Sequence, residues 1–192
     1  MRLFVAAHPS EEVRTAAARC ADRLRERLEH VGAAPGIRWI PPGNMHLTVW
    51  FLGEVSDARA DAVLDALRPP IPFAPFSLHI SGFGAFPPSG PPRVLWMSVT
   101  EGLDGLAHLH EEVGARLQPW GFRPEGRAYS AHLTIARLKE PPHGAARAAI
   151  RNAVMHEEGD AGICPVDHLV VFRSRTSPSG AAYEPLLRVP LR

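Results

Sequence analysis

One four-residue pattern occurs twice in this chain and constrains its fold more than any other feature. It reads His46-Leu47-Thr48-Val49 in the first half and His132-Leu133-Thr134-Ile135 in the second. Each copy lies in an apolar run typical of a β-strand, where residues two apart point to the same face. Each histidine therefore projects beside its threonine, and the aliphatic residues point toward a core. Two related halves of the fold would bring the two polar pairs to face each other across a cleft.

The apolar patterns predict helices and strands around both motifs. The order of these elements predicts an α+β fold with two pseudo-symmetric lobes, each a mostly antiparallel sheet backed by helices, and a catalytic cleft between them. We expect residues 1–192 to form a single domain, with the boundary between the lobes near 69–75. The predicted helices are 11–30, 57–68, 103–117 and one after Pro142, and the predicted strands beside the two motifs are 2–7, 76–83, 94–99, 169–173 and 186–191.

The composition narrows the classes of function. A net charge of +1 over 192 residues is far from the basic profile of a protein that binds nucleic acid non-specifically, so any RNA contact would be a local patch. Cys20 and Cys164 are the only cysteines, which favours a reduced, cytoplasmic setting. We expect no signal peptide and no contact with a membrane, because no apolar stretch approaches the length of a span.

The flanks of the two motifs resemble those of the two-histidine (2H) phosphoesterases. Arg38-Trp39-Ile40-Pro41-Pro42-Gly43-Asn44 precedes the first motif, Tyr129-Ser130-Ala131 precedes the second, and Ala136-Arg137 follows it. The pattern is similar to the LigT-like branch, the RNA 2′,3′-cyclic phosphodiesterases or 2′-5′ RNA ligases, over nearly the whole chain. Members of this branch usually carry a proline where this chain has Ala131, a difference that affects loop geometry more than chemistry.

The resemblance implies an enzyme that opens the terminal 2′,3′-cyclic phosphate of RNA to a 2′-phosphate, with reversible 2′-5′ ligation as a second reaction. It implies acid–base chemistry without a metal ion or other cofactor. The expected partners are RNA 3′ ends that carry the cyclic phosphate, tRNA fragments among them, and we expect the protein to act as a monomer.

The residue types agree with that chemistry. One histidine would take a proton from water and the other would protonate the departing sugar oxygen, and we assign the base to His132 and the acid to His46. This pair predicts a bell-shaped pH–rate profile. Thr48 and Thr134 would bind the phosphate oxygens. Arg137 would add a positive charge, but its odd offset from His132 requires that the strand end or bulge between them.

Four further residues are weaker candidates for RNA contacts. Arg123 and Arg127 precede the second motif, and the aromatic side chains of Trp50 and Phe4 would stack on a base. Two other sets of histidines have simpler interpretations. His108 and His110 lie two apart in a predicted helix, about 200° apart around its axis, so they do not form a metal site. His79 is interpreted as an ordinary strand residue.

Three alternatives remain open at this point. A related phosphodiesterase that acts on 2′-5′ linkages or small cyclic nucleotides would share the cleft, and a substrate profile would separate it. An RNA-end binding module without turnover would bind RNA and hydrolyse nothing. A metal-dependent hydrolase is disfavoured because no Asp/His cluster has the spacing of metal ligands, and activity in EDTA would exclude it.

Overall fold

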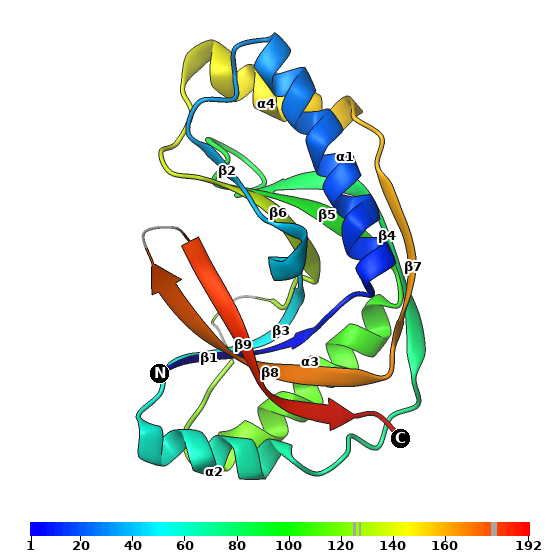
Figure 1. Ribbon diagram of the computed structural model, residues 1–192, viewed down its shortest axis with the longest axis vertical. Helices are drawn as coiled ribbons and strands as arrows, with labels where there is room; N and C mark the ends of the chain where they lie inside the picture. Colours follow the sequence, from blue (N-terminus) through cyan, green and yellow to red (C-terminus); the bar gives the residue numbers. More distant parts are fainter. Residues whose placement is uncertain (125, 127, 178–179) are drawn as a thin grey trace.

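The structure, a computed structural model, describes residues 1–124, 126, 128–177 and 180–192. Within these residues the strands form one curled nine-stranded sheet (Figure 1). Its order is β7-β4-β5-β6-β3-β1-β8-β9, with β2 paired to β6, and the pairs between these strands are antiparallel. The strands are β1 (Arg2–Ala7), β2 (Ile37–Trp39), β3 (Leu47–Glu54), β4 (Phe76–Phe86), β5 (Val94–Glu101), β6 (His132–Leu138), β7 (Asp160–Val166), β8 (His168–Ser177) and β9 (Gly180–Pro190).

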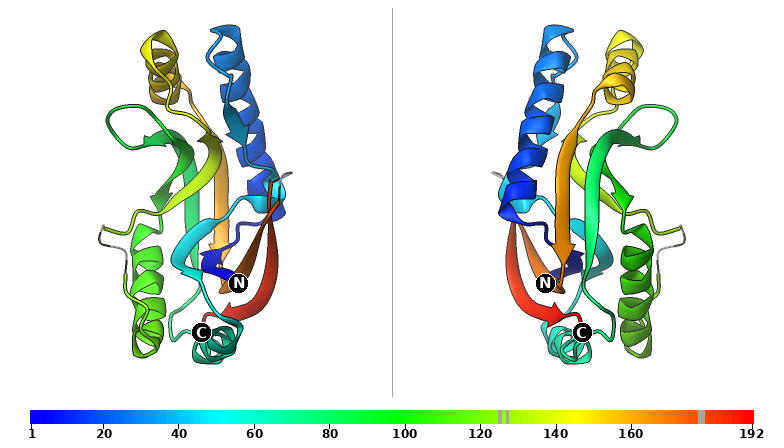
Figure 2. Two further views of the ribbon diagram at one scale, coloured as in Figure 1. Left: turned by 90° about the vertical axis from the view of Figure 1, so that its left-hand side faces the viewer. Right: turned by 90° about the vertical axis from the view of Figure 1, so that its right-hand side faces the viewer.

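Helices pack against the sheet in two groups at opposite ends of the molecule (Figure 2). The first half of the sheet consists of β7, β4, β5, β6 and β2, where α1 contacts β7 and α4 contacts β4. The second half consists of β3, β1, β8 and β9, where α3 contacts β3 and α2 contacts α3. The helices are α1 (Glu11–His30), α2 (Asp57–Leu67), α3 (Leu103–Leu117) and α4 (Gly144–His156), with short 3-10 helices η1 (Pro42–Asn44) and η2 (Gln118–Trp120). The α+β fold class predicted from the sequence is confirmed.

The two halves of the sheet are not consecutive in the sequence. Residues 69–75 connect α2 in the second half to β4 in the first. The second half takes β1 and β3 from before this connection and β8 and β9 from after it. The predicted boundary near 69–75 therefore does not separate the halves, because both chain ends add strands to the same half. A single domain over residues 1–192 stays a prediction.

Local signals explain where α1 forms. Ser10 precedes it and accepts a hydrogen bond from the backbone N–H of Val13 at 3.4 Å. Glu11 and Glu12 lie in its first turn, where the helix dipole favours negative charge. Its apolar stripe is buried in the main core between the sheet and the helices, as the periodicity predicted. None of the described helices is long and apolar enough to cross a membrane.

Strands β2 and β7 were not predicted, and β8 and β9 are longer than predicted. Strand β2 has only three residues, and Gly162 and Pro165 interrupt the apolar alternation of β7. Proline is tolerated in β7 because this strand lies at the edge of the sheet. The outer parts of β8 and β9 pair with each other and carry polar residues and glycine, which gave no apolar signal.

Candidate active site

The two motifs meet on β3 and β6, the strands that join the two halves of the sheet. Leu47 pairs directly with Leu133, and both are fully buried. The antiparallel register around this pair places each histidine across from the threonine of the other motif. Because the leucines point into the core, His46, Thr48, His132 and Thr134 project from the opposite face. We call this the motif face.

Each motif is followed by a β-bulge at the same position. Thr48 pairs with Ala6 and Trp50 with Val5, so the residue between them on β3 is extra. Thr134 pairs with Trp96 and Ala136 with Leu95, so one residue of β6 is likewise extra. A bulge shifts the alternation by one, so the residue three positions after each threonine returns to the motif face. These residues are Phe51 and Arg137.

Arg137 therefore lies on the same face as His132 and Thr134. It pairs with Val94, two residues from the partner of Thr134 on β5, so both side chains leave the sheet on one side. Its positive charge is among the causes that lower the pKa of His46. This is the geometry that the sequence analysis required of Arg137, and its contact with phosphate stays a prediction.

Each motif histidine makes the same kind of hydrogen bond to a backbone carbonyl. Nδ1 of His46 donates to the carbonyl oxygen of Asn44 at 2.7 Å, and Nδ1 of His132 donates to that of Ser130 at 2.8 Å. In each motif the acceptor lies two residues before the histidine. A hydrogen bond from Nδ1 puts the proton of the neutral ring on that nitrogen, so Nε2 is the basic nitrogen of each ring. The site thus presents two imidazoles in the same tautomer.

The pKa of His46 is lowered from 6.5 to about 4. Burial is the largest cause, because it disfavours the charged imidazolium, and the hydrogen bond to Asn44 acts in the opposite direction. The positive charges of His8, Arg137 and His132 lower the pKa further. His46 is therefore neutral near pH 7 in the unliganded protein. This argues against the acid role that the sequence analysis gave to it.

Aromatic side chains from both halves surround the histidines. Phe4 and Tyr183 lie 4.7 and 5.0 Å from His46, measured between ring centroids. Phe86 and Trp96 lie 5.0 and 6.1 Å from His132. Sequence analysis missed Tyr183, Phe86 and Trp96 as site residues. Their positions follow from pairings between strands far apart in the chain, which no local pattern reports.

Two of the residues predicted to contact RNA, Trp50 and Phe4, are buried. Trp50 is 4% exposed, because the bulge turns it to the core side of β3, where it packs 4.7 Å from His110. Phe4 is on the motif face but is also 4% exposed, with its ring packed against those of His46, Phe172 and Tyr183. Neither ring has a free face for a base, and Phe4 instead supports His46.

Of the two arginines predicted to contact RNA from the loop before β6, the structure describes only Arg123. Arg123 is exposed between η2 and β6, so its role in binding RNA stays a prediction. Arg127 lies outside the residues that the structure describes.

The two histidines of α3 have separate contacts. His110 donates from Nδ1 to the carbonyl oxygen of Val49 at 2.7 Å. His108 instead stacks on Phe73 at 4.4 Å.

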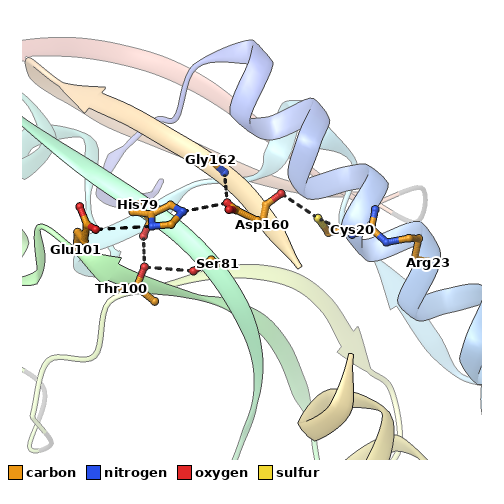
Figure 3. Close-up of polar contacts among 8 residues, drawn as sticks. All are labelled: Cys20, Arg23, His79, Ser81, Thr100, Glu101, Asp160 and Gly162. Carbon is orange, nitrogen blue, oxygen red and sulfur yellow. Dashed lines mark hydrogen bonds and ion pairs between the residues drawn. The ribbon is translucent and has the colours of Figure 1, made fainter. Parts of the chain in front are cut away.

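His79 belongs to a polar cluster that includes neither motif (Figure 3). It lies 3.0 Å from Oδ1 of Asp160 and 4.0 Å from Glu101. The backbone N–H of Gly162 and the contact with His79 lower the pKa of Asp160. No group of three His, Cys, Asp or Glu side chains in the described part of the chain is arranged to hold a metal ion. The cluster ties β4, β5 and β7 together.

A pocket of about 470 Å³ opens beside His46. Strands β8 and β9 form one wall, which is mostly apolar and aromatic but also carries His168 and Arg188. The other wall carries polar groups from η1 and from His8, between β1 and α1. A volume of this size is within the range of small-molecule sites. The lining residues are His8, Gly43, Asn44, His46, His168, Val170, Phe172, Tyr183, Pro185, Leu186, Leu187 and Arg188.

Known proteins share both the sequence and the fold. Residues 12–96 and 98–183 match the family described as LigT like Phosphoesterase. An RNA 2′,3′-cyclic phosphodiesterase of Thermotoga maritima is 32% identical over 187 residues, which are 97% of this chain and 93% of that protein. One of Aeropyrum pernix is 32% identical over 169 residues, 87% of this chain and 92% of that protein.

Solved structures agree with this result. The crystal structure of TT0787 of Thermus thermophilus has a TM-score of 0.73 at 28% identity, covering 100% of this chain and 98% of that one. Escherichia coli LigT complexed with 3′-AMP has a TM-score of 0.65 at 24% identity, over 99% and 97% of the two chains, which shows a shared fold. The resemblance read from the two motifs is confirmed, and this chain belongs to the LigT-like phosphoesterase family.

Proposed function

We propose that this protein hydrolyses the terminal 2′,3′-cyclic phosphate of RNA to a 2′-phosphate, with His46 and His132 as the acid–base pair and without a metal ion. The observation that carries the proposal is the pair of imidazoles on neighbouring strands, each oriented by the same kind of hydrogen bond from Nδ1 to a backbone carbonyl. The relatives named RNA 2′,3′-cyclic phosphodiesterases support the same reaction.

In this mechanism the cyclic phosphate lies between the two histidines. A neutral imidazole removes a proton from water as it attacks phosphorus, and the bond from phosphorus to the sugar 3′-oxygen breaks. The other imidazole, initially protonated, gives its proton to that oxygen. Thr48, Thr134 and Arg137, all on the motif face, would donate to the non-bridging oxygens, where negative charge grows.

The lowered pKa of His46 reverses the roles assigned from the sequence. A group that is neutral at pH 7 starts in the form that accepts a proton, so His46 is the better base. His132 then supplies the proton to the leaving oxygen. The pocket beside His46, with its aromatic and aliphatic wall, would hold a nucleoside of the substrate.

The test is hydrolysis in EDTA of a short RNA that ends in a 2′,3′-cyclic phosphate, with the position of the product phosphate resolved. We expect a 2′-phosphate, and a loss of about 10²–10⁴-fold in kcat for His46→Ala and for His132→Ala. His143→Ala, an exposed histidine before α4, is the matched control and should keep full activity. A 3′-phosphate product would contradict the proposal. RNA binding without hydrolysis would favour a binding module instead.

A further inference from the structure

A second arginine shares the motif face with Arg137. Arg38, on β2, pairs directly with Arg137 on β6, and side chains of directly paired residues leave a sheet on the same side. The bulge in β6 places Arg137 on the face of His132 and Thr134. Arg38 is therefore on that face too, and β2 lies along the same edge of β6 as β3, because β5 occupies the other edge. An adjacent strand lies about 4.8 Å away.

The pair brings two positive charges together without an acidic partner among the described residues. Like charges directly opposite each other on a sheet are destabilising. By contrast, Arg173 and Arg175, two neighbouring arginines on β8, share the carboxylate of Glu184. For Arg38 and Arg137, no carboxylate in the described part of the chain lies within the 4.0 Å that defines an ion pair. An anionic ligand would remove the repulsion.

The guanidinium of Arg38 reaches across the site toward the β8–β9 hairpin. A Cβ atom at Gly180, the first residue of β9, would lie 2.6 Å from its Nη2. The next residue, Ala181, accepts a hydrogen bond at 2.7 Å from the side chain of Asn44 in η1. In Figure 1 the described parts of β8 and β9 extend toward the half of the sheet that carries β2. Arg38 and Asn44, both from the flank of the first motif, thus lie beside the first two residues of β9.

We infer that Arg38 binds the phosphodiester that joins the terminal nucleotide to the rest of the RNA, beside the reacting phosphate at Arg137. The inference rests on the proposed function and names its substrate class. A cyclic mononucleotide has no second phosphate, so it cannot engage Arg38. An RNA chain of two or more nucleotides can, through the bidentate contact that guanidinium makes with phosphate. The protein then selects RNA ends over cyclic mononucleotides.

The experiment compares two substrates that differ by one adenosine and the phosphodiester that joins it: adenosine 2′,3′-cyclic phosphate and the dinucleotide ApA with a terminal 2′,3′-cyclic phosphate. For Arg38→Ala we expect kcat/KM on the dinucleotide to fall about 10- to 100-fold, mainly through KM, the size of a charged hydrogen bond. The value on the mononucleotide should change less than about twofold. Arg38→Lys should recover part of the loss, since it keeps the charge without the fork. Arg147→Ala, an exposed arginine on α4, is the control.

Equal losses on both substrates, or no loss on either, would overturn the inference. Equilibrium binding gives a readout that does not depend on turnover. Wild type should bind ApA with a terminal 2′-phosphate more tightly than adenosine 2′-phosphate, and Arg38→Ala should remove most of that difference. If wild type hydrolyses neither cyclic substrate, the proposed function fails, while the binding difference still decides whether Arg38 contacts the second phosphate.

Discussion

The two histidine motifs share a backbone and differ in their surroundings. Each histidine donates from Nδ1 to the carbonyl two residues before it, and each threonine is followed by a bulge. The hydrogen bond at His46 is partly buried and the one at His132 is exposed. The repeated sequence therefore orients two equivalent imidazoles. The neighbours, which the repeat does not specify, determine the protonation state in which His46 starts.

The bulges make a second difference visible. They bring Phe51 in the first motif and Arg137 in the second to equivalent positions on the motif face. Phe51 is 43% exposed and lies under the guanidinium of Arg2, at 5.1 Å from its ring centroid. Only one of these two positions offers a donor to a phosphate. The site is thus symmetric in its histidines and threonines and asymmetric in its charge.

Substitution at these two equivalent positions gives the largest expected contrast. Arg137→Ala should lower kcat/KM on the cyclic phosphate about 10²–10³-fold, the loss typical when one donor to a developing anion is removed. Phe51→Ala, the matched change, should stay within about threefold of wild type. The measurement is steady-state hydrolysis of both variants. Comparable losses in the two would show that the asymmetry has no catalytic meaning.

The pH dependence tests the difference in burial. If His46 is the base, kcat/KM should fall on the acid side with a midpoint near pH 4, the pKa of His46 in the free protein. A midpoint near the ordinary imidazole value of about 6.5 would instead support the assignment made from the sequence. The basic limb reports the acid and completes the bell.

The free energy of unfolding should also depend on pH through the lowered pKa of His46. The pKa of His46 is about 4 when folded and 6.5 when unfolded, so below pH 6.5 the unfolded chain binds more protons. Stability is therefore lost as the pH falls from about 6.5 toward 4, by at most about 2 kcal/mol between pH 7 and pH 5. Urea unfolding at both pH values should show this loss in wild type and a smaller one in His46→Gln. Equal losses would mean that His46 is not the group responsible.

The aromatic support of His132 can be disturbed through a glycine. A Cβ atom at Gly84 on β4 would lie 2.2 Å from the ring of Trp96, which packs against His132. Gly84→Ala should displace the indole, lower kcat/KM about 10-fold and cost about 1–3 kcal/mol of stability. Gly114→Ala is the matched control, because its Cβ would meet the ring of Trp50 at 2.6 Å, on the core side. It should lower stability and leave kcat/KM near wild type.

The sequence predicted those features of the site that follow from the alternation of side chains along a single strand. It placed each histidine with its threonine on one face and identified the family. It did not show the bulges, because these depend on the register of β3 against β1 and of β6 against β5. For the same reason Trp50 was expected on the motif face and is in the core. The burial of His46 was also out of reach, since Phe4 and Tyr183 come from strands near opposite ends of the chain.

Two side-chain hydrogen bonds stabilise the bulge of the first motif, and we expect the smallest change in activity when one of them is removed. Tyr129, from the flank of the second motif, donates its hydroxyl to the carbonyl oxygen of Thr48 at 3.1 Å and stacks on His110 at 4.4 Å. His110 in turn donates to the carbonyl oxygen of Val49, the extra residue of the bulge. Together these bonds satisfy two carbonyl groups of the bulged strand and connect the two motifs.

Tyr129→Phe keeps the ring and removes one hydrogen bond, so it should cost about 1 kcal/mol of unfolding free energy. His110→Phe should cost more, about 1–3 kcal/mol, because it leaves the carbonyl of Val49 without its donor. Both are measured by urea unfolding, with kcat/KM recorded in parallel. If these two bonds only stabilise the bulge, Tyr129→Phe should change kcat/KM less than about threefold. A larger loss at unchanged stability would mean that the position of Thr48 itself depends on Tyr129, and that the two motifs are coupled through this bond rather than built independently.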